Sequence, residues 1–191
     1  MDMQGSRVLN ATQEQAWQAL NDPDILKACI PGCDKFELAE PNVYAVGVAI
    51  KIGPVAAKFT GKVSLMDIVP PNSYALQFEA QGGIAGFGKG ESKVELKPVD
   101  RGVELNYTVH SQVGGKIAQL GQRLIDGVAK TLAEDFFTRF EEQLQARHGG
   151  ADASTSSEGN NENTETTGAT PTWVWALSIV IAASAAWFIA R

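Results

Sequence analysis

The sequence predicts an α+β protein in which a strongly curved antiparallel β-sheet wraps around one long C-terminal helix, followed by a C-terminal transmembrane helix. Three observations predict this fold class. Six segments between residues 36 and 109 alternate apolar and polar residues, as half-buried strands do. Residues 116–147 carry an apolar stripe at steps of three and four, which indicates a long amphipathic helix. Residues 173–190 contain no charge, proline or glycine, as expected of a membrane span.

The chain is expected to begin with a strand over residues 3–9 and two short helices. Thr12 and Gln15 have the spacing of a capping box at the start of the first helix. The second helix is predicted to start at Asp22, because Pro23 suits the first helical turn.

Six strands are then expected in series, each with one apolar face. Their inward-facing residues are predicted to be Phe36, Leu38, Tyr44, Val46, Val48, Ile50, Ala57, Phe59, Val63, Leu65, Tyr74, Leu76, Phe78, Val94, Leu96, Val103, Leu105, Tyr107 and Val109. The long helix is predicted to cover that face with Ile117, Leu120, Leu124, Val128, Leu132, Phe136 and Phe140. One face of the sheet is then solvated and the other is covered by the helix.

The composition divides the chain into three parts: a folded domain over residues 1–148, a linker over 149–172 and an anchor over 173–190. The linker consists mostly of Gly, Ser, Thr, Asn and Glu, and is predicted to be disordered because it has almost nothing to bury. Its root-mean-square reach would be roughly 25–30 Å. Residues 1–148 contain 18 acidic and 15 basic residues, and no basic stripe indicates nucleic-acid binding.

The predicted anchor is a single helix of roughly 27 Å, close to the ~30 Å thickness of a hydrocarbon core. Trp173, Trp175 and Trp187 lie near its two ends, where aromatic rings favour the headgroup level. A buried core helix is the alternative, but the polar linker separates this segment from any core. The sequence starts without a secretory signal pattern, so the folded domain is expected on the cytoplasmic face of the inner membrane.

Signatures of catalysis and metal binding are sparse. His110 and His148 are the only histidines, too few to build a metal site with the two cysteines. Cys29 and Cys33 are expected to be free, buried or half-buried thiols, because their spacing is unlike a zinc knuckle. The glycine-rich segment at residues 82–90 joins two strands and opens no helix, so it lacks the helix N-terminus of a phosphate loop.

A small-molecule cavity is the predicted site. Alternate turns of an antiparallel meander lie at the same end of a sheet, so several loops are expected to form one rim, with Pro31, Gly82, Gly83, Ile84 and Gly115. The small residues at the start of the long helix, Gly115, Ala118 and Gly121, are expected to leave space beneath this rim. The predicted cavity residues are Phe59, Phe78, Phe87, Tyr107, Leu124 and Val128, with Phe87 as a gate and Tyr107 as the polar group inside. Two alternatives stand beside this prediction: a plain long turn whose apolar residues tuck inward, and a filled core with no room for a ligand.

Three segments resemble CoxG, a family of carbon monoxide dehydrogenase subunits: NDPDILKACIPGCDKFEL at 21–38, GKGESKVELKPV at 88–99 and GGKIAQLGQRLIDGVAKTLAEDFFTRFEEQL at 114–144. The resemblance covers residues 1–147. It implies the helix-grip fold of the START-like, birch-allergen-like (SRPBCC) superfamily. It also implies a non-catalytic accessory protein that holds a molybdenum-containing CO dehydrogenase or a related hydroxylase at the membrane, with a cavity for lipids or quinones. The family offers no catalytic residues to carry over.

Three functions therefore compete: a tethered adaptor for a redox enzyme, a carrier of a lipid or other hydrophobic molecule, and a START-like cyclase or hydrolase. The sequence favours adaptor or carrier, because the inward-facing residues include tyrosines but no ionised pair for acid–base chemistry. A respiratory quinone is the expected ligand, since a redox enzyme brought to a membrane needs an electron acceptor. No covalent cofactor and no metal are expected.

Overall fold

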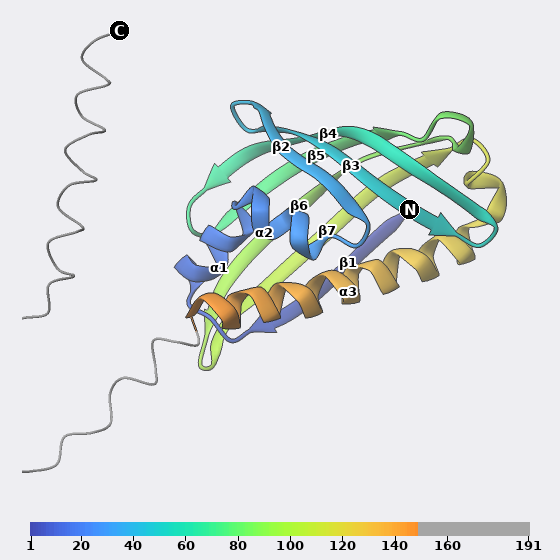
Figure 1. Cartoon of the computed structure of the whole chain (residues 1–191). Coiled ribbons are helices and arrows are strands. Elements are labelled where there is room, and N and C mark those ends of the chain that lie inside the picture. Colours follow the sequence, from blue (N-terminus) through green and yellow to red (C-terminus); the bar gives the residue numbers. More distant parts are fainter. Residues whose placement is uncertain (149–191) are drawn as a thin grey trace, which may run out of the picture. The chain divides into compact units, whose positions relative to one another are not determined.

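A seven-stranded antiparallel sheet curves around one long helix in the computed structural model, which describes residues 1–148 (Figure 1). The strand order is β1-β7-β6-β5-β4-β3-β2. The strands are β1 (Asp2–Leu9), β2 (Cys33–Glu40), β3 (Val43–Ile52), β4 (Val55–Val69), β5 (Ser73–Gln81), β6 (Phe87–Val99) and β7 (Gly102–Gly114). The predicted curved sheet and long C-terminal helix are therefore confirmed.

The predicted linker and transmembrane anchor, at 149–172 and 173–190, lie outside the described residues. Within residues 1–148, no helix combines the length and the apolar character needed to cross a bilayer.

Two short helices, α1 (Gln13–Leu20) and α2 (Pro23–Cys29), connect the edge strands β1 and β2. The predicted capping box is present: the Gln15 backbone N–H donates to Thr12 Oγ1 at 3.2 Å, and the Thr12 N–H donates to Gln15 Oε1 at 2.8 Å. The Asp22 carboxylate caps α2 by accepting from the backbone N–H groups of Asp24 and Ile25. These local signals fix where both helices start.

The long helix, α3 (Gln122–His148), begins six residues later than the sequence predicted. A short 3-10 helix, η2 (Ala118–Leu120), precedes it, and Gly121 separates the two with a φ of +90°. Residues other than glycine rarely adopt that backbone conformation. Gly121 adopts it here and interrupts the helix that the sequence predicted to be continuous. Gly115, Ala118 and Gly121, predicted to lie on the helix, instead form its approach.

The buried face of α3 also differs from the prediction. Leu124, expected to be buried, is 40% exposed, whereas its neighbour Ile125 is 8% exposed. Further along, Phe137, Phe140 and Leu144 are buried. The continuous stripe assumed one unbroken helix from residue 116, and the later start at Gln122 rotates the first turns relative to that stripe.

The core is divided unevenly along the sheet. The larger cluster gathers where α1, α2 and the C-terminal half of α3 meet, and its fully buried members are Leu9, Ala16, Cys29, Val103 and Phe140. A much smaller cluster, Phe59, Ala85 and Ile117, lies near the N-terminal end of α3. The domain is thus packed solidly at one end and less so at the other.

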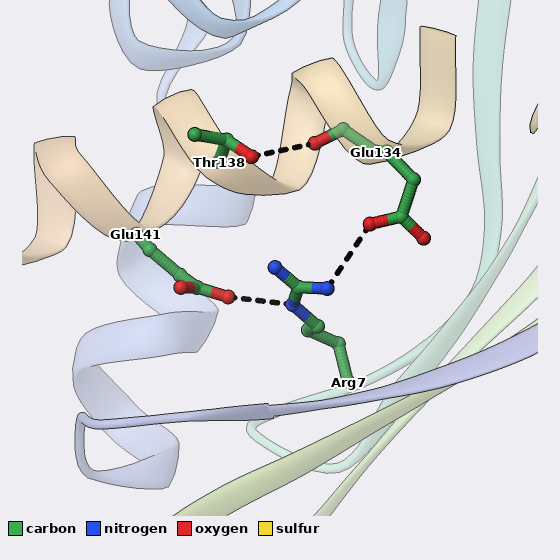
Figure 2. Close-up of polar contacts among 4 residues, drawn as sticks. All are labelled: Arg7, Glu134, Thr138 and Glu141. Atoms are coloured by element: carbon green, nitrogen blue, oxygen red, sulfur yellow. Dashed lines mark hydrogen bonds and ion pairs between the residues drawn. The ribbon is translucent and has the colours of Figure 1, made fainter. Parts of the chain in front are cut away.

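An ion-pair clasp connects edge strand β1 to α3, as Figure 2 shows. Arg7 Nε donates to Glu141 Oε1 at 2.7 Å, and Arg7 Nη1 lies 3.1 Å from Glu134 Oε2. The two acids are seven residues apart, so they lie on one side of the helix two turns apart. The Arg7 side chain is one-third exposed, so each pair should stabilise the fold by less than about 1 kcal/mol.

Candidate functional site: an apolar cavity

A cavity of about 350 Å³ lies between the concave face of the sheet and the first half of α3. Its lining comes from β1, β3 to β7, the approach to α3 and α3 itself. The apolar residues that line it are Met1, Met3, Val46, Val48, Ile50, Ile52, Phe59, Val63, Phe78, Ala80, Val109, Val113, Ile117, Ile125 and Ala129. A volume of this size falls at the lower end of the range for small-molecule pockets, and the lining is of the apolar kind.

Small residues at inward positions create the space. Gly61, Ala80 and Gly88 lie on neighbouring strands and line the cavity. A Cβ atom built on Gly88 would meet no other atom within 4 Å, so this position opens directly onto free volume. Gly61 differs, because a Cβ atom there would lie 1.9 Å from the Glu79 carbonyl oxygen, so the close approach of β4 and β5 requires a glycine. The small side chain of Ala80 and the missing one of Gly88 explain why the sheet is not filled here.

Aromatic rings lie across glycines in a recurring cross-strand pattern. Tyr107 pairs with Gly5, Phe78 with Gly90 and Phe87 with Gly114 in the strand registers. In each pair, a Cβ atom on the glycine would come within 2.9 Å of the ring. The glycines thus give the rings room to lie against the backbone, an arrangement known to support glycines in sheets.

The structure places two of the six predicted cavity residues in the cavity lining, Phe59 and Phe78. Phe87, Tyr107, Leu124 and Val128 are not part of it. On α3, the lining residues are instead Ile125 and Ala129, each one position further along. The later helix start accounts for this shift.

Phe87 and Tyr107 are displaced for different reasons. Phe87 begins β6 one residue before the inward-facing Gly88, and alternation along a strand places successive side chains on opposite faces. Tyr107 does face inward, but its ring packs between Gly5 and Phe137, with ring centroids 5.6 Å apart for the aromatic pair. Burial raises the pKa of the Tyr107 phenol. The proposed gate and the proposed polar group are therefore both outside the cavity lining.

The predicted rim is partly assembled at one end of the sheet. Gly82 and the short 3-10 helix η1 (Gly83–Ala85) form the β5–β6 turn, in which Ile84 is 85% exposed and Ala85 is buried. The Ile117 N–H donates to the Ala85 carbonyl at 3.0 Å, which joins this turn to the approach of α3. Ile84 thus points outward, contrary to the alternative of a turn with all its apolar residues tucked inward.

Of the other two predicted rim residues, Gly115 lies at this rim and Pro31 lies apart from it. A Cβ atom on Gly115 would lie 2.4 Å from Gly86 Cα, so Gly115 packs directly against the β5–β6 turn. Pro31 precedes Gly32, whose carbonyl accepts from the Ala49 N–H at 2.9 Å. That contact lies along β3, set back from the β3–β4 turn at its end.

Ser111 is a polar lining residue that the sequence did not point to. It shares the inward face of β7 with Val109 and Val113, and all three line the cavity. Among residues 1–148, no hydrogen bond involves the Ser111 hydroxyl, which leaves it free to bind a polar atom of a ligand. The period of two along β7 extended beyond Val109 would have included Ser111, but a serine gives no apolar signal.

Elsewhere, the titratable groups take structural roles. Cys29 is buried and Cys33 half-buried, both as free thiols, as predicted. Burial raises the pKa of the Cys29 thiol to about 11 and also raises the pKa of Cys33, so both are protonated at neutral pH. His110 is exposed, and its Nδ1 lies 2.6 Å from Asp2 Oδ1. No cluster of three or more metal-binding side chains occurs in the described part of the chain.

Solved structures share this architecture. A conserved protein from Geobacillus kaustophilus is 38% identical, with a TM-score of 0.73 over 78% of this chain and 97% of its own. A Thermus thermophilus protein is 14% identical, with a TM-score of 0.60 over 78% of this chain and 99% of its own. Ara h 8.0201 is 16% identical, with a TM-score of 0.53 over 76% of this chain and 98% of its own. The last two likenesses show the fold alone.

Fold and cavity together define a helix-grip α+β protein, in which a curved antiparallel sheet and a long C-terminal helix enclose an apolar cavity. The sequence pattern of CoxG, a subunit of carbon monoxide dehydrogenase, matches residues 5–145. The chain therefore belongs to the CoxG family, which is a family of accessory rather than catalytic subunits. The comparison with curated proteins gives no match.

Proposed function

We propose that this chain is a membrane-tethered accessory protein that carries a respiratory quinone in its cavity and holds a molybdenum-containing CO dehydrogenase, or a related hydroxylase, at the cytoplasmic membrane face. The observation that carries the proposal is the apolar cavity of about 350 Å³ beneath α3. Such a cavity favours a ligand that is mostly hydrocarbon, because burial of apolar surface drives binding.

A quinone fits the lining better than a simple hydrocarbon chain. Apolar residues surround almost the whole cavity, and Ser111 adds a hydroxyl on the inward face of β7. A quinone has an apolar tail and a ring with two carbonyl oxygens, so the Ser111 hydroxyl can donate to one of them. A membrane lipid that offered only its acyl chains would leave this hydroxyl without a partner.

Recruitment of the enzyme rests on the family. The name of the family associates its members with carbon monoxide dehydrogenase. An accessory protein that holds both the enzyme and a quinone would bring the electron donor and the electron acceptor together at the membrane. The tether rests on residues 173–190, whose composition is that of a single membrane span.

The tether is tested by placing arginine in its middle. Ile179→Arg and Ala183→Arg should each cost about 2.5–3.5 kcal/mol near the bilayer centre. The chain should then move from the membrane to the soluble fraction, together with its partner enzyme. Ser156→Arg and Thr166→Arg, in the predicted linker, add the same charge outside the span and should leave both proteins at the membrane. If the enzyme stays at the membrane when the tether is broken, the recruiting role is wrong.

A further inference from the structure

Charge is sorted along the long axis of the domain. At one end lie the β3–β4 turn, the β5–β6 turn and the approach to α3, next to the cavity. Segments 49–58, 82–90 and 112–126 carry one acidic residue, Asp126, against the basic residues Lys51, Lys58, Lys89, Lys116 and Arg123. We call this end the mouth face.

The opposite end has the reverse balance. Segments 20–24, 40–43, 66–73, 99–102 and 139–147 carry the basic residues Arg101, Arg139 and Arg147 against the acidic residues Asp22, Asp24, Glu40, Asp67, Asp100, Glu141 and Glu142. Figure 1 shows these turns together with α1, α2 and the end of α3, away from the start of that helix. A domain with more acids than bases therefore presents one basic end.

Most of the basic side chains of the mouth face are exposed and unpaired. Lys51, Lys89, Lys116 and Arg123 are exposed, and none of them takes part in the ion pairs formed within residues 1–148. Lys58 differs, because it pairs with Asp34. We call the four unpaired residues the basic collar. Their charge is available to an anionic partner.

The same face carries exposed apolar residues. Ile84 is 85% exposed, Leu124 40% and Phe87 38%. They belong to one end of the fold: the Phe87 ring lies across Gly114, and a Cβ atom on Gly53 would lie 3.2 Å from the Leu124 side chain. We call these three residues the apolar tip. Solvent-exposed apolar residues within a basic surround are the pattern of a surface that inserts shallowly into an anionic membrane.

We propose that the mouth face docks on an anionic lipid bilayer, with the apolar tip inserted among the headgroups and the basic collar against the lipid phosphates. The end of the domain that lies next to the cavity then faces the membrane. The docking surface is distinct from the predicted anchor, because it lies within the folded domain. It also does not require the ligand to be a quinone.

The test follows the depth of the apolar tip in the full-length chain reconstituted into vesicles. An environment-sensitive fluorophore is attached to Ile84→Cys in a Cys33→Ser background, in which Cys29 stays buried. Asp100→Cys, in the β6–β7 turn at the opposite end, carries the same label as the matched control. Quenching by brominated lipids is compared between vesicles of phosphatidylcholine alone and vesicles with phosphatidylglycerol.

The label at residue 84 should be quenched in the anionic vesicles and not in neutral ones, and the label at residue 100 in neither. Each lost basic charge should weaken docking about fivefold. The combined variant Lys51→Glu, Lys116→Glu and Arg123→Glu should therefore reduce docking by at least about 100-fold, as should 0.5 M salt. Circular dichroism of the variant checks that it is folded.

The proposal is overturned if the label at residue 84 remains unquenched, if neutral vesicles quench it equally, or if the charge reversals change nothing. It is also overturned if that label becomes buried only when the partner enzyme is added, because the face is then a protein interface. Gly88→Leu, which adds a side chain inside the cavity, should leave docking intact. A variant that loses ligand binding but still docks bears on the proposed function alone. A variant that loses docking but still binds the ligand bears on the docking surface alone.

Discussion

The Phe59 ring lies directly over Gly82: a Cβ atom on Gly82 would come within 2.4 Å of Phe59 Cε1. Phe59 lines the cavity on β4 and is 8% exposed, whereas Gly82 begins the β5–β6 turn. The nearest atoms to that Cβ all belong to the Phe59 ring. The absence of a side chain at residue 82 therefore lets an aromatic ring form part of the cavity lining.

Gly82→Ala should destabilise the fold by about 1–3 kcal/mol, because the ring has to move within a packed site. In a Phe59→Leu background, the same change should cost less than about 0.5 kcal/mol, because the clashing atoms are gone. Urea denaturation of the four proteins in the double-mutant cycle measures the difference. Additive effects would show that the ring and the glycine do not constrain each other.

Gly88→Leu should block the cavity without unfolding the protein. The new side chain enters open volume, since a Cβ atom there has no neighbour within 4 Å. We expect binding of a short-chain quinone analogue to weaken at least about tenfold, with a change in stability of less than about 1 kcal/mol. Lys89→Leu places the same side chain on the opposite face of β6 and should bind normally. Normal binding by Gly88→Leu would locate the ligand elsewhere.

Ser111→Ala separates a quinone from a hydrocarbon chain. Loss of one hydrogen bond of about 0.5–1.5 kcal/mol should weaken binding of the quinone analogue about 2- to 13-fold. A saturated hydrocarbon of similar length should bind the variant and the wild type equally. Calorimetric titration with both compounds measures this contrast. Equal loss for both would mean that Ser111 acts only through packing.

Asp22 connects α2 to the end of α3, because its carboxylate caps α2 and lies 2.9 Å from Arg147 Nη2. Burial opposes ionisation of Asp22, but the backbone N–H groups of Ile25 and Asp24 and the Arg147 guanidinium outweigh it, so the pKa is lowered. The stabilisation should therefore be present above pH ~4, the usual range for Asp, and be lost as the pH falls through the lowered pKa.

Asp22→Ala should cost about 1 kcal/mol at pH 7, with the cost shrinking below pH 4. Asp22→Asn keeps a capping acceptor and removes the charge, so its stability relative to Asp22→Ala should depend little on pH. Urea denaturation at pH 7 and pH 3 provides the comparison. A cost for Asp22→Ala that is the same at both pH values would contradict the electrostatic part of this account.

The sequence predicted the parts of the fold whose signals are local. The capping pair Thr12 and Gln15 and most of the strand alternation depend on near neighbours, and the structure confirms them. Leu38 is an exception: it was predicted to face inward but is 61% exposed, on the edge strand β2 next to a register shift. The start of α3 was not predicted correctly, because the apolar stripe continues through residue 117 and gives no sign that Gly121 adopts a positive φ. Because the helix starts later than predicted, Ile125 lines the cavity in place of the predicted Leu124.

The cavity itself was only partly predictable. Phe59 and Phe78 follow from strand alternation, but the free space depends on Ala80 and Gly88 facing inward from the neighbouring strands β5 and β6. Their juxtaposition is a property of the three-dimensional register, not of any local pattern. The ring of Tyr107 faces inward as predicted and yet lies outside the cavity lining, because Phe137 from α3 and Gly5 from β1 enclose it.

Whether the cavity holds a quinone is tested most directly by identifying the molecules that co-purify with the protein. Full-length wild-type protein and Gly88→Leu are purified in parallel from membranes in the same detergent, extracted with organic solvent and compared by mass spectrometry. We expect about one quinone per wild-type chain and at least fivefold less in Gly88→Leu. Equal amounts in both proteins, or no quinone in either, would contradict the proposed quinone binding.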